Sequence, residues 1–169
     1  MDPIAALADR LLYELEFRSV EELEIAKSLP SEFSKLDFLG MRTYFDSLIA
    51  VGLVSADDLE AQDVADRFDW FQMFFDRLLE IGPTMRGLVI DNLTGRSGLL
   101  GYVFRTPPTR DRIEQIRALR HGSAAKLGYC LAWVVDVQNV QIHRHRGLPF
   151  KVYPGKRFFQ KALQELTRD

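Results

Sequence analysis

The segment from Gln62 to Ile81 constrains the fold more than any other part of the chain, because its pattern predicts a long helix with a wide apolar surface. The apolar residues on this surface are Val64, Phe68, Phe71, Phe75 and Leu78 in one stripe, with Trp70, Phe74 and Ile81 beside it. The opposite side carries Asp66, Asp69, Asp76 and Glu80. An apolar arc of about half the circumference is wide for a surface helix. This helix must therefore pack against a sheet or against another chain.

The remainder of the N-terminal half has patterns that favour further helices. Helical spacing of apolar residues predicts helices over 3–16 and 37–51. Ser19 begins a capping-box sequence, S-V-E-E, which predicts a short helix ending near residue 29. Ser55 precedes Ala-Asp-Asp and is a candidate cap for another short helix.

The pattern changes after Gly82-Pro83, where shorter apolar segments predict strands. Strands are expected over 86–92 and 99–105 around the turn T-G-R-S-G, and over 128–137, 140–146 and 150–153. Helices are expected over 110–120 and 156–167. Segment 128–137 is apolar on both faces, which is typical of a central strand.

This order of elements predicts an α+β fold in which N-terminal helices precede an antiparallel sheet of about five strands with two packed helices. The order in the second half is strand-strand-helix-strand-strand-strand-helix. A length of 169 residues is typical of one domain. We therefore expect an acidic, aromatic-rich helical region, 1–82, and a basic sheet region, 83–169, to form one continuous globular unit.

The net charge of −2 conceals a strong asymmetry between the two halves of the chain. Residues 1–85 hold 7 basic and 18 acidic residues, whereas residues 86–169 hold 15 basic and 6 acidic residues. Such an asymmetry indicates a surface for a polyanion or an acidic partner. The alternative is that two oppositely charged surfaces attract each other within one domain.

Basic residues of the C-terminal half are candidates for contact with nucleic-acid phosphates, because the planar fork of arginine donates bidentate hydrogen bonds to phosphate. Two of them lie two turns apart on the predicted helix 110–120, and the others follow residue 143. The predicted contact residues are Arg110, Arg117, Arg144, Arg146, Lys151, Lys156 and Arg157. The alternative for the helix is a solvated face with local pairing to Glu114.

His143 and His145 are weak candidates for metal ligands. Side chains alternate along a strand, so these two are expected to project from the same face. A protein metal site usually needs a third or fourth ligand. The sequence places none at an obvious spacing, so we predict no metal site.

The sequence carries no motif that predicts a catalytic residue or a cofactor. Cys130 lies within an apolar segment and is expected to be buried and unreactive. Gly95, Gly98 and Gly101 do not form the dinucleotide fingerprint G-x-G-x-x-G and do not precede a helix. These observations favour a protein that is not an enzyme and uses no cofactor.

The chain has no predicted membrane partner. Its N-terminus lacks the features of a signal peptide, and its longest apolar segment, 127–135, is too short to cross a bilayer. A single cysteine cannot form an internal disulfide. We therefore expect a cytoplasmic protein.

Three hypotheses about function follow, and the first is the one we favour. It is a non-enzymatic accessory or assembly subunit that contacts RNA or DNA through its basic half and docks to protein through its acidic helical half. The second is a protein–protein adaptor, chaperone or homodimeric scaffold module with no nucleic-acid role. Its interface anchors would be aromatic, namely Trp70, Phe71, Phe74 and Phe75. The third is a small-molecule sensor or enzyme with a pocket between sheet and helix.

Overall fold

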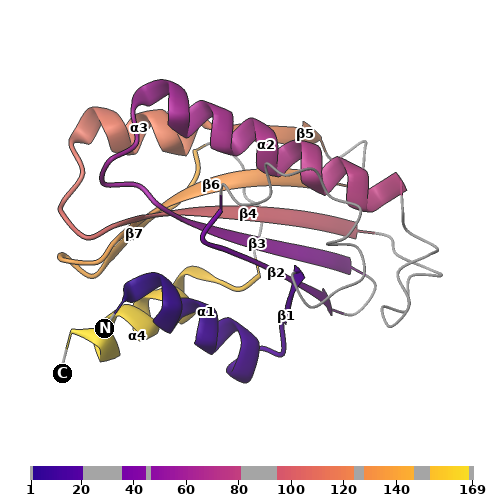
Figure 1. Ribbon diagram of the computed structural model, residues 1–169, viewed down its shortest axis with the longest axis horizontal. Coiled ribbons are helices and arrows are strands. Elements are labelled where there is room, and N and C mark those ends of the chain that lie inside the picture. The colour runs from indigo at the N-terminus through magenta and orange to yellow at the C-terminus, as the bar shows by residue number, and fades with distance from the viewer. Residues whose placement is uncertain are drawn as a thin grey trace.

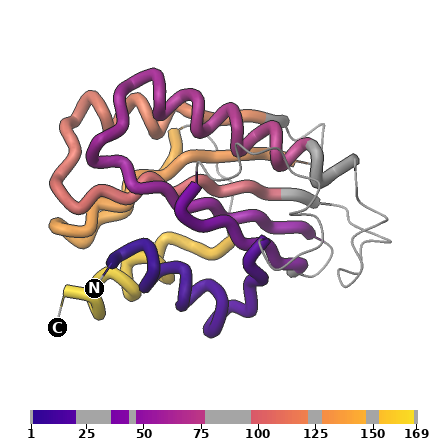
Figure 2. Tube along the Cα trace, in the orientation of Figure 1, coloured from indigo at the N-terminus to yellow at the C-terminus, as the bar shows by residue number. Residues whose placement is uncertain are grey.

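The computed structural model describes residues 2–20, 36–44, 47–80, 95–123, 128–146 and 153–167. A mixed sheet lies between two pairs of helices (Figure 1). One face is covered by α2 (Ala61–Glu80) and α3 (Arg110–Ala118). The other face is covered by α1 (Pro3–Glu14) and α4 (Lys156–Leu166), which lie side by side in Figure 2.

Seven strands form the sheet in the order β1-β2-β3-β4-β6-β5, and β7 pairs with β6 beyond the end of β5. In chain order, β1 to β7 span Arg18–Ser19, Phe38–Tyr44, Ser47–Ser55, Gly95–Phe104, Arg120–Ser123, Gly128–Asp136 and Gln141–His143. Strands β3, β4 and β6 are parallel, and the other pairings are antiparallel. The parallel strands follow one another in a single direction across the sheet. Right-handed connections therefore place α2 and α3 on the same face.

The α+β class is confirmed, but the prediction of an antiparallel sheet of five strands is wrong. Segment 37–51, predicted as a helix, instead forms most of the hairpin of β2 and β3. Residues 48–54 of β3 are buried without interruption, because helices cover both faces of the sheet. A strand buried on both sides has no polar alternation. Its apolar spacing therefore matches a helix as well as a strand.

The turn predicted at T-G-R-S-G is also wrong, because Gly95 to Gly98 lie within β4. This strand runs parallel to β3 and does not return from a preceding hairpin partner. The helix predicted over 110–120 ends at Ala118, and His121-Gly122 belongs to β5. Ser55 ends β3, and the chain makes only a turn before α2. The predicted strand 86–92, most of the predicted strand 150–153 and most of the predicted helix 19–29 lie outside the described residues.

The long amphipathic helix predicted over 62–81 is confirmed as α2. Its residues Phe71, Phe74 and Phe75 are buried in the apolar cluster between α2 and the sheet. The sheet thus covers the described part of the apolar arc, as far as Phe75, without a second chain. The helices predicted at 3–16 and 156–167 are confirmed as α1 and α4, and the central strand predicted at 128–137 is confirmed as β6.

Glycines in the parallel strands let the aromatic rings of α2 lie close to the sheet. A Cβ atom at Gly98 would stand 2.7 Å from Cys130 Sγ and 3.0 Å from the Phe71 ring. A Cβ atom at Gly52 would stand 3.2 Å from the same ring. Cys130 is buried, as predicted, and burial raises the pKa of its thiol. These glycines thus serve helix packing.

Gly98→Ala should destabilise the protein by about 1–3 kcal/mol, because the added methyl overpacks the core. The control is Gly40→Ala, whose Cβ would meet the ring of Phe38 at 2.7 Å. That ring is only partly buried and can rotate away, so the control should lose less. Urea denaturation measures both changes. Cys130→Ala should recover part of the loss in the double variant; equal losses at Gly98 and Gly40 would contradict this packing account.

A partly buried arginine joins the first and last helices. Arg10 Nε lies 2.6 Å from Glu14 Oε1, and Arg10 Nη1 donates to Glu165 Oε2 at 2.6 Å. The guanidinium also lies 5.8 Å from the centre of the Phe158 ring. The hydrogen bond from Arg10 lowers the pKa of Glu14. Residues near the two ends of the chain are thereby held together.

Glu14→Gln should lower stability at neutral pH and flatten its dependence on pH in acid. The folded pKa of Glu14 lies below the ordinary value of 4.5. The stabilisation is therefore present above that value and is lost as the pH falls through the folded pKa. Unfolding free energies across the acid range test this. Asp9→Asn removes an exposed carboxylate of the same helix and should show no comparable flattening; parallel pH profiles for wild type and Glu14→Gln would refute it.

Candidate nucleic-acid interface

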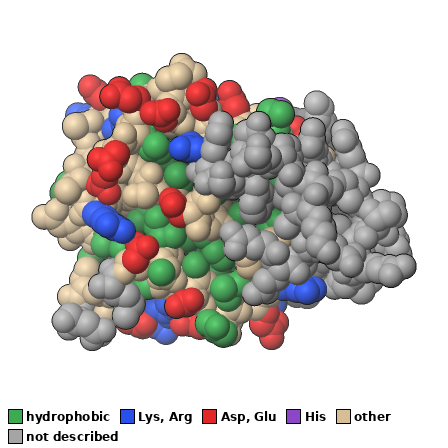
Figure 3. All heavy atoms as spheres, in the orientation of Figure 1, with side chains coloured by type: hydrophobic (Ala, Val, Ile, Leu, Met, Phe, Trp, Pro, Cys, Tyr) green, Lys and Arg blue, Asp and Glu red, His purple; other side chains and the backbone are tan. Residues whose placement is uncertain are grey.

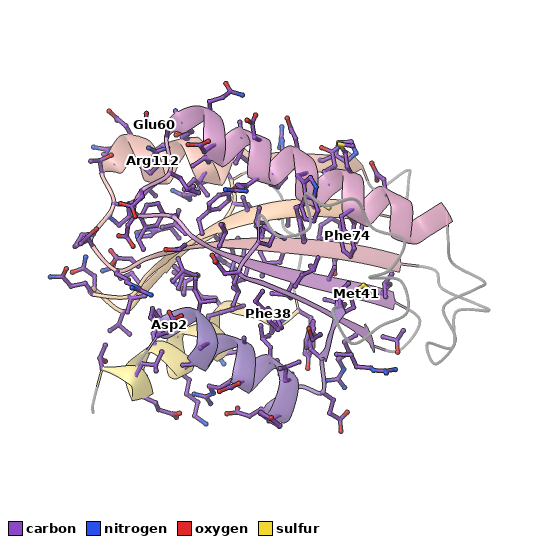
Figure 4. The ribbon with its side chains drawn as sticks, in the orientation of Figure 1. Asp2, Phe38, Met41, Glu60, Phe74 and Arg112 are labelled. Atoms are coloured by element: carbon purple, nitrogen blue, oxygen red, sulfur yellow. The ribbon has the colours of Figure 1, made fainter. Side chains whose placement is uncertain are left out.

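Helix α3 is fixed to the sheet and to α2 by one part of its surface. Thr109 caps its start by accepting from Arg112 N at 3.3 Å, and Ile116 is fully buried against the sheet. Arg112 Nη2 donates to Leu59 O at 2.9 Å, and Gln115 Nε2 donates to Ala61 O at 3.0 Å. Figure 4 shows Arg112 beside the start of α2. This side of α3 therefore holds α2.

A second side of α3 holds the segment that follows β7. Arg117 Nε donates to Arg144 O at 2.6 Å, and Arg146 N donates to Arg117 O at 3.0 Å. The second bond satisfies a carbonyl in the last turn of α3, where helix carbonyls lack partners of their own. Residues 144–146 are thus fastened to the C-terminal turn of α3.

A single carboxylate links the arginines of these two segments. Glu114 Oε1 lies 3.0 Å from Arg117 Nη1, and Glu114 Oε2 pairs with Arg146 Nη2. The Arg117 side chain is 30% exposed, whereas that of Arg146 is 63% exposed. Arg144 is exposed as well. Two of the predicted contact residues, Arg117 and Arg146, therefore pair with Glu114, and the main chain of a third, Arg144, is bonded to Arg117.

The basic residues continue from this cluster toward the start of α4. His143 ends β7 and is half-buried. Burial lowers its pKa, the charges of Arg117 and Lys156 act in the same direction, and Asp136 and Glu114 oppose them. Both cations therefore lie within electrostatic reach of one imidazole. Lys156 is half-buried in the first turn of α4, and Arg157 beside it is exposed.

We call the set formed by Arg110, Arg117, Arg144, Arg146, Lys156 and Arg157 the basic edge. Arg110 begins α3 and is exposed, on the same helical stripe as Glu114 and Arg117. The contacts and the electrostatic neighbours of His143 connect four of the six residues, 117, 144, 146 and 156. Lys151, the seventh predicted residue, lies outside the described residues.

The two histidines do not share a face of the sheet, so that prediction is wrong. The strand ends at His143, which pairs in register with Val134 of the cluster under α2 and α3. His145 accepts a hydrogen bond from Trp133 Nε1 at 3.0 Å, and Trp133 belongs to the cluster under α1 and α4. Alternation fails because the strand stops between them. No three His, Cys, Asp or Glu side chains in the described ranges form a group that could hold a metal ion.

The acidic half supplies little of the charge that pairs with the basic edge. Asp66, Asp69 and Asp76 are exposed on α2, and Figure 3 shows acidic side chains along the top of the molecule. Asp76 lies 3.8 Å from His121 of β5. The carboxylate that pairs with the arginines at 117 and 146 is Glu114, from the same half of the chain. Among the described ion pairs, the acids of α2 reach none of the basic-edge residues.

Hydrogen bonds join the segments that follow the carboxyl ends of the parallel strands. Open α/β sheets usually bind ligands at that end, where the strand order reverses. Here β3, β4 and β6 follow without a reversal. Asp57 accepts from Arg105 N at 3.0 Å and from Thr106 N at 2.9 Å, which fastens the loop after β4. Val137 N donates to Phe104 O at 2.9 Å across the next pair of strands.

The aromatic residues predicted as interface anchors lie mostly inside the molecule. Phe71, Phe74 and Phe75 are buried, and Trp70 is half-buried with its ring stacked 6.2 Å from that of Phe74. Sequence reasoning found the amphipathic helix but could not decide whether a sheet or a partner covers it.

Comparisons of the chain with models of protein families, with curated proteins and with solved structures gave no significant match. In the part of the chain that the structure describes, no helix is long and apolar enough to span a membrane.

Arg117→Met should destabilise the protein by about 1 kcal/mol, because it removes a hydrogen bond to a main-chain carbonyl and an ion pair while keeping an apolar stem. The amide of Arg146 should also exchange hydrogen faster as segment 144–146 loosens from α3. Denaturation and hydrogen exchange measure these effects. The control Arg110→Met changes an exposed residue on the same stripe of α3 and should change stability by less than about 0.5 kcal/mol. Unchanged hydrogen exchange at the Arg146 amide in Arg117→Met would contradict the attachment of segment 144–146 to α3 by Arg117.

Proposed function

We propose that this protein is a non-enzymatic accessory subunit that contacts the phosphate backbone of RNA or DNA through the basic edge. The observation that carries the proposal is the meeting of Arg117, Arg144 and Arg146 at one place, with two of the three side chains exposed. Because the main chain of segment 144–146 is held to α3, little backbone ordering is needed before its arginines donate to phosphate oxygens.

The length of α3 suits an extended polyanion. Arg110 and Arg117 are seven residues apart, which corresponds to about 10 Å along a helix. Duplex DNA carries one charge per about 1.7 Å of its axis, so several charges lie within that span. Such contacts release counterions and carry no sequence information. The interface would therefore give affinity without sequence specificity.

The start of α4 supports the same proposal. Lys156 and Arg157 occupy the first turn, and the N-cap Gly155 makes no side-chain capping bond. Cations are unfavourable at the positive end of a helix dipole, by about 0.3–1 kcal/mol each at an exposed site. A phosphate group near these residues would offset that cost.

The exposed acids of α2 fit an accessory subunit. Phosphates are repelled by Asp66, Asp69 and Asp76, so the field of the protein would direct nucleic acid toward the basic edge. The same acidic surface would remain available to a basic protein partner. Light scattering separates this proposal from the homodimeric alternative: a monomer at micromolar concentration supports it, and a stable dimer contradicts it.

Fluorescence anisotropy with a short single-stranded RNA and a short DNA duplex, at about 50 mM salt, tests the phosphate contacts. Arg144→Gln/Arg146→Gln should weaken binding at least about tenfold and reduce the slope of log affinity against log salt by about 2. The matched control Arg18→Gln/Lys161→Gln removes the same charge from exposed residues elsewhere. It should weaken binding by less than about threefold, through the long-range field alone. Equal losses in the two variants, or no binding by the wild type, would exclude the proposed interface.

A further inference from the structure

Glu114 binds two guanidinium groups in the way that a backbone phosphate would. Its Oε1 lies 3.0 Å from Arg117 Nη1, and its Oε2 pairs with Arg146 Nη2. The two arginines come from different elements, and each takes one oxygen of the same anion. Carboxylate and phosphate are the two groups that arginine forks recognise with the same geometry.

The two arginines differ in how firmly each is held. Arg117 is 30% exposed and also donates through Nε to Arg144 O at 2.6 Å. Arg146 is 63% exposed, and its backbone N–H, rather than its side chain, makes the bond to Arg117 O. The Arg146 side chain can therefore leave Glu114 without moving segment 144–146. The Arg117 side chain cannot leave without losing its bond to Arg144 O, which is one of the two bonds that hold that segment.

We propose, on the basis of the proposed function, that Glu114 occupies the place of a phosphate in the free protein and is exchanged for one on binding. Arg146 exchanges its ion pair with the carboxylate for one with a backbone phosphate. Arg117 stays in place and keeps Glu114 neutralised, so the exchange makes it a positioning residue rather than one of the phosphate contacts of the basic edge. Glu114 is half-buried, but it keeps its pair with Arg117, so the exchange does not leave the carboxylate without a cationic partner.

The exchange makes Glu114 a competitor of the nucleic acid. In Glu114→Gln the amide oxygen can still accept from Arg117, but the amide nitrogen cannot accept from Arg146. Arg146 is then unpaired before binding, so its contact with phosphate is gained in full. If Glu114 only organised the two arginines, the same substitution would loosen the site and weaken binding. The two roles therefore predict opposite changes in affinity.

Anisotropy titrations of the full chain, with the RNA and DNA probes above, test the exchange. Glu114→Gln should bind about 3–10-fold more tightly at about 50 mM salt, with a log–log salt slope steeper by about 1. The control Asp111→Asn removes the same charge from an exposed residue of α3. It should change affinity by less than about twofold. In an Arg146→Gln background the gain from Glu114→Gln should disappear, because the two residues are coupled.

The outcomes separate this inference from the proposed function. If the wild type binds and Arg144→Gln/Arg146→Gln weakens it, but Glu114→Gln equals Asp111→Asn or binds less tightly, the exchange is wrong and the interface stands. If the wild type binds neither probe, both are wrong.

A second measurement uses the wild-type protein, so its outcome does not depend on whether a variant folds. Arg146 Nε–H in the wild type should shift in NMR spectra on addition of RNA, while Arg117 Nε–H stays in place. Movement of both resonances, or of Arg117 alone, overturns the exchange.

Discussion

The packing of α2 on the parallel strands is the contact on which the rest of the structure depends. The Phe71 ring lies over Gly52 of β3 and Gly98 of β4, so one side chain holds two neighbouring strands under one helix. That contact fixes β4 beside β3, and α3 then carries the chain to β6 in the same direction. Strands β4 and β6 are therefore added one after the other on the same side of β3.

The basic edge is a consequence of how the sheet ends. The outer side of β6 is shared by two short strands: β5 pairs with residues 128–131 and β7 with residues 134–136. Because β7 is short, the chain leaves the sheet at His143 and reaches the last turn of α3. The proposed interface is therefore made from a helix terminus and a strand exit rather than from a pocket. It needs only two segments that are held at a fixed distance.

The sequence predicted most reliably those elements whose environment is simple. Helices α2 and α4 have one buried and one exposed side, so their periodicity is unambiguous, and β6 is apolar from Tyr129 to Val135. Strand β3 was predicted as part of a helix because burial on both faces removes the alternation that marks a strand. The arginines could be chosen by residue type and position, but their meeting could not be predicted. That meeting depends on the length of β7 and on hydrogen bonds between main-chain atoms and Arg117.

The charge asymmetry of the chain does not correspond to two separate bodies in space. The sheet places β2 and β3 from the acidic half directly beside β4 and β6 from the basic half. Among the described residues, exposed carboxylates lie on α2, and exposed arginines lie around the end of α3 and the exit of β7. With a low net charge and such a distribution, the protein does not attract polyanions as a whole, but its electrostatic potential differs from one surface to another. In the proposed function, this field would orient the phosphate backbone of the nucleic acid. Glu114 would neutralise part of the positive charge at the proposed interface, so the nucleic acid would dissociate readily.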